Sequence, residues 1–258
     1  PYLMNISGLG TAVEYKSPLQ SIMIGLYRKA AKKTSCLFFQ NQENEEFFES
    51  HHMYNGKKYR IPGSGVNLKR WYLMDYPSDE QGVDFLYIGR VIKQKGIEEY
   101  LEAAKQIRKE YPNTTFHVLG PCDGDYEGML AEYQNQGIIQ YHGMVPDTRE
   151  YLLHAHCTIH PSYYPEGISN ALLESAACGR PIITTNRSGC RETVEDGKTG
   201  FVFEQKNEEQ LLMCIRKFMQ MDNEARREMG IAGRKKMEKE FNRQIVIDAY
   251  MREIDGIR

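Results

Sequence analysis

The sequence has almost no net charge, no long apolar run and only one tryptophan. Its 258 residues carry a formal net charge of −2, which provides no global field to attract nucleic acid. No apolar stretch approaches the roughly 20 residues that a helix needs to cross a bilayer. The remaining composition, 41% hydrophobic and 26% charged, is typical of a globular protein of one large or two modest domains.

Cysteine is sparse and unpaired. The six cysteines are Cys36, Cys122, Cys157, Cys178, Cys190 and Cys214, with no Cys-x-x-Cys motif among them. In a chain of this length the pattern favours reduced thiols without a metal or disulfide role, and therefore a cytoplasmic setting. No signal peptide is recognisable, and because translation does not start at proline, Pro1 indicates a processed product or a fragment.

After about residue 80, short apolar runs alternate with helix-length amphipathic segments. The runs are apolar on both faces and recur at the spacing of βαβ units, so we predict an α/β domain with a doubly wound parallel sheet. The predicted strands are 85–89, 114–120, 138–143, 157–162, 180–185 and 199–203. The predicted helices are 96–110, 125–136, 147–155, 169–178 and 190–196, followed by a helical tail at 207–220, 223–238 and 242–255.

The first 80 residues contain only about two βα units. "YLMNI", "SCLFFQ" and "KYRIP" look like strands, with helices at 18–32 and near 43–51. So few strands do not make a stable sheet alone, so we interpret 1–72 as the last part of an acceptor-side α/β domain. A complete donor-binding domain would follow at 73–258, after a glycine-rich hinge at 61–71. The last helix, 242–255, is a candidate to cross back to the first domain.

Two cations follow the strand that ends at Gly89. In "IGRVIKQKG", Arg90 and Lys95 stand between this strand and the next helix. Doubly wound sheets bind ligands at the carboxyl ends of their strands, and a forked Arg with a flexible Lys suits a diphosphate. A charged surface loop explains this stretch equally well.

Two glutamates, Glu166 and Glu174, lie eight residues apart in "YYPEGISNALLESAACG". With Ser169 or Asn170 as N-cap, the helix that follows presents free N–H groups and its positive dipole end, which is an anion site. Eight helical residues span about 12 Å, which approximates the distance between the sugar and the ribose of a nucleotide sugar. The alternative is a locally paired Glu174 and a solvated Glu166.

Three stretches together resemble the carboxyl-terminal domain of glycosyltransferase family 4, retaining enzymes with the GT-B fold. They are "GRVIKQKG", "PEGISNALLESAACGRPIITT" and "GCRETVEDGKTGFV", and the resemblance is strong over 84–258. The sequence at 63–66 is similar to the family's interdomain hinge, and 4–15 resembles a late loop of its amino-terminal domain. The chain is similar to members that extend lipid-linked saccharides for capsule or O-antigen type glycans.

The resemblance implies roles for individual residues around a donor. Arg90 and Lys95 would hold the diphosphate, and both would act in catalysis by stabilising the leaving phosphate. Ser169 and the helix N-terminus would meet a phosphate, and Glu174 would bind the ribose hydroxyls.

The other implied contacts concern the sugar and the base. Glu166, with the backbone of Gly167 and Ile168, would contact the donor sugar, again as part of the catalytic set. Val145, in the loop 141–147, would flank the base. We also expect the carboxylates of Glu166 and Glu174 to lie too far apart for a double-displacement glycosidase, which needs a separation of about 5 Å.

The implied reaction is a metal-independent transfer from a nucleotide-diphosphate sugar, most simply a UDP-sugar. The acceptor would be a saccharide or a polyprenyl-diphosphate-linked saccharide, met at the cytoplasmic face of the membrane through peripheral contact. Three alternatives stay open: a GT-B nucleotide-sugar epimerase, a synthase or phosphorylase of sucrose or trehalose metabolism, and a non-catalytic nucleotide-sugar-binding fragment.

Two apparent metal motifs carry little weight. The acidic pair around Gly124, Asp123 and Asp125, has no third ligand in view. His154, His156 and His160 straddle a helix end and a strand, so their side chains should point in different directions. Lys57, Lys58 and Arg60 are too few to indicate binding of anionic lipid.

Overall fold

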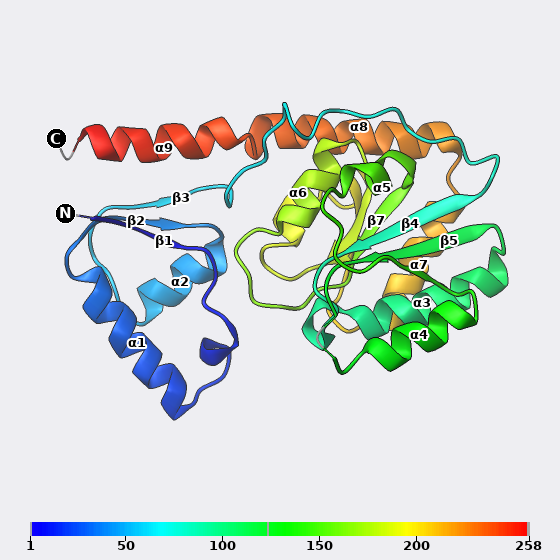
Figure 1. Cartoon of the computed structure of the whole chain (residues 1–258). Coiled ribbons are helices and arrows are strands. Elements are labelled where there is room, and N and C mark those ends of the chain that lie inside the picture. Colours follow the sequence, from blue (N-terminus) through cyan, green and yellow to red (C-terminus); the bar gives the residue numbers. More distant parts are fainter. Residues whose placement is uncertain (1, 123, 257–258) are drawn as a thin grey trace.

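The computed structural model describes residues 2–122 and 124–256 as two α/β units (Figure 1). The larger unit contains a six-stranded parallel sheet and the smaller one a three-stranded parallel sheet. The predicted α/β class with a doubly wound parallel sheet is therefore confirmed.

The larger sheet has the strand order β6-β5-β4-β7-β8-β9. The chain starts in the middle, moves outward to one edge, and then returns to build the other half, so the direction reverses between β4 and β7. Open α/β sheets bind their ligands at this reversal, beyond the carboxyl ends of the strands. The strands are β4 (Val83–Ile88), β5 (Thr114–Leu119), β6 (Gln140–Tyr141), β7 (Cys157–His160), β8 (Ile182–Thr185) and β9 (Gly200–Phe203).

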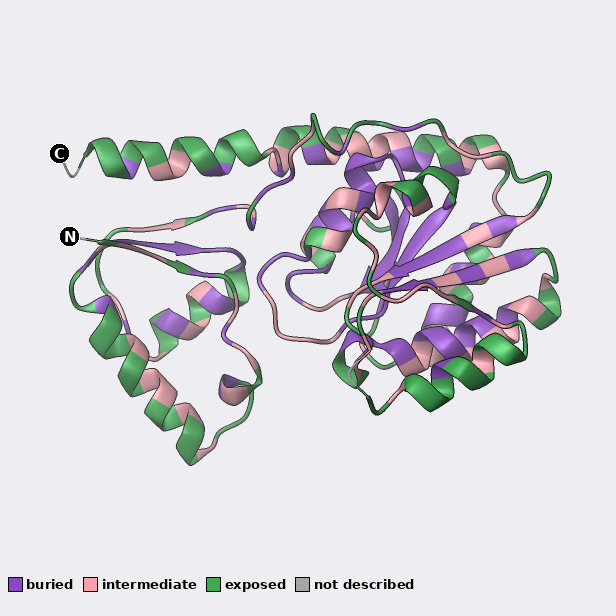
Figure 2. Ribbon diagram, viewed as in Figure 1, coloured by how far each residue is buried: buried purple, intermediate pink, exposed green. Residues whose placement is uncertain are grey.

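Helices cover both faces of this sheet because its strands are apolar on both sides. Along β4, Phe85 and Tyr87 pack into one core with α3 and α7, whereas Leu86 packs into the other with α5, α6 and α8. Figure 2 shows the central strands buried and the outer helix faces exposed. The helices are α3 (Ile97–Glu110), α4 (Glu127–Asn135), α5 (Arg149–His154), α6 (Asn170–Ala177), α7 (Glu208–Met219) and α8 (Asn223–Glu240).

Three predicted elements are shorter than expected. The helix predicted at 190–196 is wrong: only a 3-10 turn, η3 (Arg191–Thr193), forms there. The hydroxyl of Thr193 donates to the Cys190 carbonyl, and Val194 is already extended, so no second turn develops. Strand 138–143 is reduced to β6, an edge strand with two residues in register with β5, and the helix predicted at 147–155 is reduced to α5.

The smaller unit is built around β2. Side chains alternate along this strand: Leu37 and Phe39 pack with the cluster that includes α1 and α2, while Cys36 and Phe38 face the opposite side. Both faces are therefore covered although the sheet has only three strands. The elements are β1 (Tyr2–Ile6), η1 (Thr11–Val13), α1 (Pro18–Ala31), β2 (Thr34–Phe39), α2 (Gln42–Ser50) and β3 (Lys58–Arg60).

The last helix, α9 (Arg243–Asp255), lies across the smaller sheet (Figure 1). Val246 and Tyr250 cover its open face, and the rings of Tyr250 and Phe38 are 4.4 Å apart. The chain thus passes between the units twice, near residue 66 and again at 242, where Val66 and Phe241 are hydrogen-bonded. The division into an acceptor-side and a donor-side domain at residue 72 stays a prediction.

Arg187 joins the two units electrostatically. From the loop after β8 its guanidinium lies 2.8 Å from Glu14 and 3.8 Å from Glu43, both in the smaller unit. The Arg187 side chain is only 14% exposed, while that of Glu43 is 51% exposed. The pair with Glu14 is the better shielded one, so it should contribute most of the coupling.

We expect Arg187→Met to destabilise the chain by about 1 kcal/mol at low salt, because one partly buried, charge-assisted contact is lost. This should appear as a fall of about 2–4 °C in the thermal midpoint. Exposed Arg191 in the same loop provides the control, since Arg191→Met should change little. High salt should shrink the difference, and an equal loss at all salt concentrations would show that packing, not charge, joins the units here.

Candidate active site

The loops after β4 and β7 meet at the reversal point of the larger sheet. The first contains η2 (Lys93–Lys95), and the second runs from Pro161 to Ser169. The amide of Tyr163 donates to the Gln94 carbonyl at 2.9 Å, which ties the loops together. Gly96 is required at this junction, because its φ is +75° and a Cβ would collide with the carbonyl of Pro161.

Lys95 and Glu166 form a close ion pair between these loops. Nζ of Lys95 lies 2.7 Å from Oε1 of Glu166, and the two side chains are 10% and 22% exposed. Burial opposes ionisation of Glu166, yet contact with the His160 imidazole and the charge of Lys95 bring the pKa of the carboxyl down to about 2. Withdrawing two charges from water gives little net stability, so such a pair at the reversal point of the sheet indicates a functional site.

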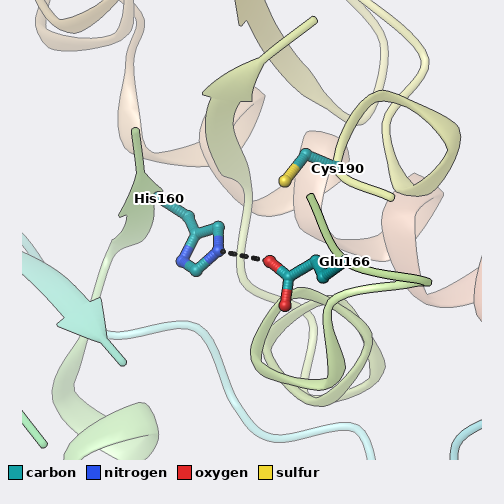
Figure 3. Close-up of side chains that lie close together, drawn as sticks. All are labelled: His160, Glu166 and Cys190. Carbon is teal, nitrogen blue, oxygen red and sulfur yellow. Dashed lines mark ion pairs between the residues drawn. The ribbon is translucent and has the colours of Figure 1, made fainter. Parts of the chain in front are cut away.

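His160 supports this pair from the end of β7. Its Nε2 lies 3.7 Å from the same carboxylate oxygen of Glu166 and 3.3 Å from the hydroxyl of Ser169. Burial lowers the pKa of His160, so the imidazole is neutral at physiological pH. The buried thiol of Cys190 completes the group of side chains drawn in Figure 3.

The backbone around Glu166 is held from both units. The side-chain amide of Asn41 donates to the carbonyls of Glu166 and Gly167, each at 3.0 Å. Gly8 also lies so close that a Cβ there would be 3.3 Å from the Cα of Glu166. Asn41 follows β2 and Gly8 follows β1, so the carboxyl ends of the two sheets face each other across this loop.

Arg90 occupies the outer part of the site. It is exposed, and its guanidinium lies 5.5 Å from the ring centre of Tyr164, while Nζ of Lys95 lies 5.3 Å from the same ring. The structure therefore places Arg90 and Lys95 beside one aromatic ring, with Glu166 paired to Lys95. Their binding of a donor stays a prediction.

Glu174 faces a different environment from Glu166. Burial on α6 raises its pKa to about 7; the positive charges of Arg70 and Arg243 lower it, and Asp147 raises it further. The part of the chain that the structure describes shows no hydrogen bond to this carboxylate. The side chain is half-buried, so part of the hydration of this acceptor group is lost, and a ligand that supplies donors would offset that cost.

The other predicted donor contacts lie near these groups but have additional roles. Ser169 is the N-cap residue of α6, as expected, without a side-chain capping bond. Its amide donates to the Gly189 carbonyl at 2.9 Å. Ile168 packs into the second core, with Gly63 so close that a Cβ there would lie 2.7 Å from it. Val145 is half-buried against the same core. Their contacts to a donor stay predictions.

Sequence reasoning missed Asn41 and Tyr164, and it considered His160 only as a metal ligand and set it aside. The position of His160, the last residue of a strand at the reversal point, was a usable signal once the strand order was assumed. Asn41 could not be found, because its partner lies 125 positions away in sequence.

The histidines and the cations that the sequence left without a role do not gather around a common ligand. Nδ1 of His156 accepts from the amide of Asp84 at 3.0 Å, whereas His160 faces Glu166, so the histidines point apart. Asp123 lies outside the described residues. Of the three cations discounted above, Lys57 pairs with Glu253, and Lys58 and Arg60 pair with Glu45.

Most of the chain matches a known protein family. The model of the family described as glycosyl transferases group 1 matches residues 74–236, more than half of the chain. The chain belongs to this family. That confirms the resemblance to glycosyltransferase family 4, and the matched region includes both loops of the site.

Individual glycosyltransferases show how far the likeness extends. The chain is 26% identical over 221 residues to N,N'-diacetylbacillosaminyl-diphospho-undecaprenol alpha-1,3-N-acetylgalactosaminyltransferase of Campylobacter jejuni, covering 80% of this chain and 58% of that protein. It is 30% identical over 164 residues to the capsular polysaccharide biosynthesis glycosyltransferase CapM of Staphylococcus aureus, covering 62% and 42%. The chain thus spans about half the length of the curated relatives that it matches.

Solved structures confirm the GT-B fold. Anabaena HepE, solved in complex with UDP and glucose, superposes with a TM-score of 0.81 at 16% identity, over 99% of this chain and 72% of that one. Among the described residues, no helix is both long enough and apolar enough to span a bilayer.

Proposed function

We propose that the chain forms the donor site of a retaining glycosyltransferase that uses a nucleotide-diphosphate sugar, most simply a UDP-sugar. The acceptor is a saccharide or a lipid-linked saccharide in surface polysaccharide biosynthesis. The observation that carries this proposal is the partly buried Lys95–Glu166 pair, held at the reversal point of the sheet and facing the second unit. The relatives support it, since one is named for transfer to a diphospho-undecaprenol-linked sugar and another structure holds UDP and glucose.

Lys95 and Arg90 are the proposed diphosphate ligands. When the bond between the anomeric carbon and the diphosphate breaks, its electron pair moves onto the leaving phosphate oxygen. A cation already fixed at that position stabilises the new charge without reorganisation. Lys95 is fixed by Glu166, and Arg90 is free to adapt to the second phosphate. The chemistry needs no metal in this arrangement.

Glu166 is the proposed sugar ligand and not a base. With a pKa near 2 it is ionised at every physiological pH, and Lys95 already occupies one of its oxygens. Its remaining lone pairs can accept hydrogen bonds from sugar hydroxyls. The acceptor hydroxyl then attacks from the face that the diphosphate leaves, its proton passes to the leaving phosphate oxygen, and the configuration is retained, as the family resemblance implies.

We assign the two substrates to different units of the chain. We propose that residues 73–258 bind the donor and that 1–72 contribute the acceptor side, with α9 crossing back to it. We also propose a cytoplasmic protein that meets lipid-linked acceptors by peripheral contact at the inner membrane face.

Calorimetry with UDP on this chain tests donor binding, and mass spectrometry of the complete natural protein with UDP-sugars and extracted acceptor lipids tests transfer. NMR of the product should show the anomeric configuration of the donor, and inversion would contradict the mechanism. Product formed from donor alone would indicate an epimerase. Transfer to the acceptors used in sucrose or trehalose metabolism would favour a synthase or phosphorylase of that metabolism. UDP binding without any transfer would favour a non-catalytic binding protein.

A further inference from the structure

Three side chains with metal-binding atoms converge beside the Lys95–Glu166 pair (Figure 3). The imidazole of His160, the carboxylate of Glu166 and the thiol of Cys190 each offer one such atom, and the three atoms all lie within 4.8 Å of one another. Nε2 of His160 and Oε1 of Glu166 are 3.7 Å apart. Tetrahedral zinc, bound at about 2.0–2.3 Å from N, O and S ligands, holds its ligands about 3.3–3.7 Å apart. The set therefore closes around one ion with a shift on the order of 1 Å.

These three residues stand on a fixed frame. His160 lies in β7, in register with Thr184 of β8. The Cys190 and Glu166 segments are locked together, because the Ser169 amide donates to the Gly189 carbonyl and a Cβ on Gly189, whose φ is +92°, would collide with the carbonyl of Gly167. A preformed frame reduces the ordering cost of binding an ion.

We propose that His160, Glu166 and Cys190 form a site for a thiophilic divalent cation such as Zn²⁺ or Co²⁺, which competes with Lys95 for Glu166. A thiolate and an imidazole favour such ions over Mg²⁺. On binding, Cys190 releases its thiol proton to solvent, and His160 offers the lone pair of Nε2 while its proton resides on Nδ1. Three protein ligands leave a fourth position for water or a small ligand.

The cation and Lys95 compete because both would contact the same carboxylate oxygen of Glu166. Nζ of Lys95 lies 2.7 Å from Oε1 of Glu166, the oxygen nearest His160. A divalent cation at this oxygen repels the ammonium strongly in a partly buried site. The ion and the ion pair therefore exclude each other.

Occupancy of the site would withdraw both Glu166 and Lys95 from a donor. That consequence rests on the proposed function, whereas metal binding itself does not. The test below uses cobalt absorption, so failure of the metal site and failure of the donor assignment remain distinguishable.

The experiment titrates this chain with Co²⁺ and records its visible and near-ultraviolet absorption. Wild type should develop a thiolate-to-cobalt charge-transfer band together with the strong visible bands of four-coordinate cobalt. Cys190→Ser should lose the charge-transfer band and bind at least about tenfold more weakly. Cys36→Ser is the matched control, since Cys36 is equally buried but lies in the smaller unit, and it should behave as wild type.

Lys95→Met supplies a measurement that does not depend on the folding of the cysteine variants. Without the competing ammonium it should bind Co²⁺ at least about tenfold more tightly than wild type. No charge-transfer band in wild type, an unchanged band in Cys190→Ser, or unchanged affinity in Lys95→Met would each overturn the proposal.

Discussion

Lys95→Ala is expected to lower kcat/KM of the complete natural protein by about 10²–10³-fold. The variant removes a buried cation that is held against Glu166, the proposed sugar ligand, and loss of a preorganised group that stabilises the leaving charge has this magnitude. The steady-state rate of transfer with the identified donor measures the effect.

Lys93 provides the matched control for this loop. It lies two residues away in η2, is 65% exposed and pairs only with Glu98 among the described residues. An exposed pair contributes little, so Lys93→Ala should retain turnover within about twofold. Equal losses in both variants would mean that the loop's general positive charge, and not Lys95 itself, serves the reaction.

A double variant separates catalysis from stability. Lys95→Ala alone leaves the carboxylate of Glu166 without its cation and should cost about 3–5 kcal/mol, as truncating one partner of a buried pair does. Lys95→Met with Glu166→Gln removes both charges, so thermal unfolding of this chain should recover most of that loss. Turnover should stay low. Recovery of turnover together with stability would reduce the pair to a structural role.

The sequence predicts the elements of this fold well because their signals are local. The helix predicted at 207–220 is observed as Glu208–Met219, and Asn207 caps it through a bond to the Gln210 amide. The failure at 190–196 has the opposite cause: the Gly189–Cys190 turn is fixed by the distant Gly167 and Ser169. The local sequence favours a helix there, but tertiary contacts determine the observed conformation, and a local sequence pattern contains no information about them.

The site shows the same limit more sharply in its two glutamates. Glu166 has a pKa of about 2 and Glu174 a pKa of about 7, although they stand eight residues apart in one motif. The difference comes from contact of Glu166 with His160 and from the charge of Lys95, 71 positions before Glu166, and from burial of Glu174 without a bonded cation. The spacing could predict two carboxylates at one ligand, but not that one is permanently charged and the other titrates near neutrality.

Glu174→Gln should stabilise the free chain and weaken its binding of UDP. The folded-state pKa of Glu174 lies above its ordinary value of 4.5, so the group costs nothing below about pH 4.5 and destabilises the folded state as the pH rises toward and beyond 7. The full shift corresponds to at most about 3.4 kcal/mol, and solvent screening of a partly buried group reduces this to the order of 1–2 kcal/mol. The variant's midpoint should match wild type at pH 4 and exceed it by about 2–6 °C at pH 8.

Binding should change in the opposite direction. If Glu174 accepts both ribose hydroxyls, Glu174→Gln replaces one acceptor oxygen by a donor and should weaken UDP binding about tenfold at pH 8, as measured by calorimetry. The preference for UDP over its 2′-deoxy analogue should shrink as well.

Exposed Glu132 is the control, and Glu132→Gln should alter neither stability nor affinity. A stability gain without loss of UDP affinity would leave Glu174 as a titrating core residue and remove it from the donor site. Loss in both measurements would instead mean that its carboxylate has a protein partner. A higher midpoint together with weaker UDP binding would therefore show that the Glu174 carboxylate destabilises the free chain and is stabilised by the bound ligand.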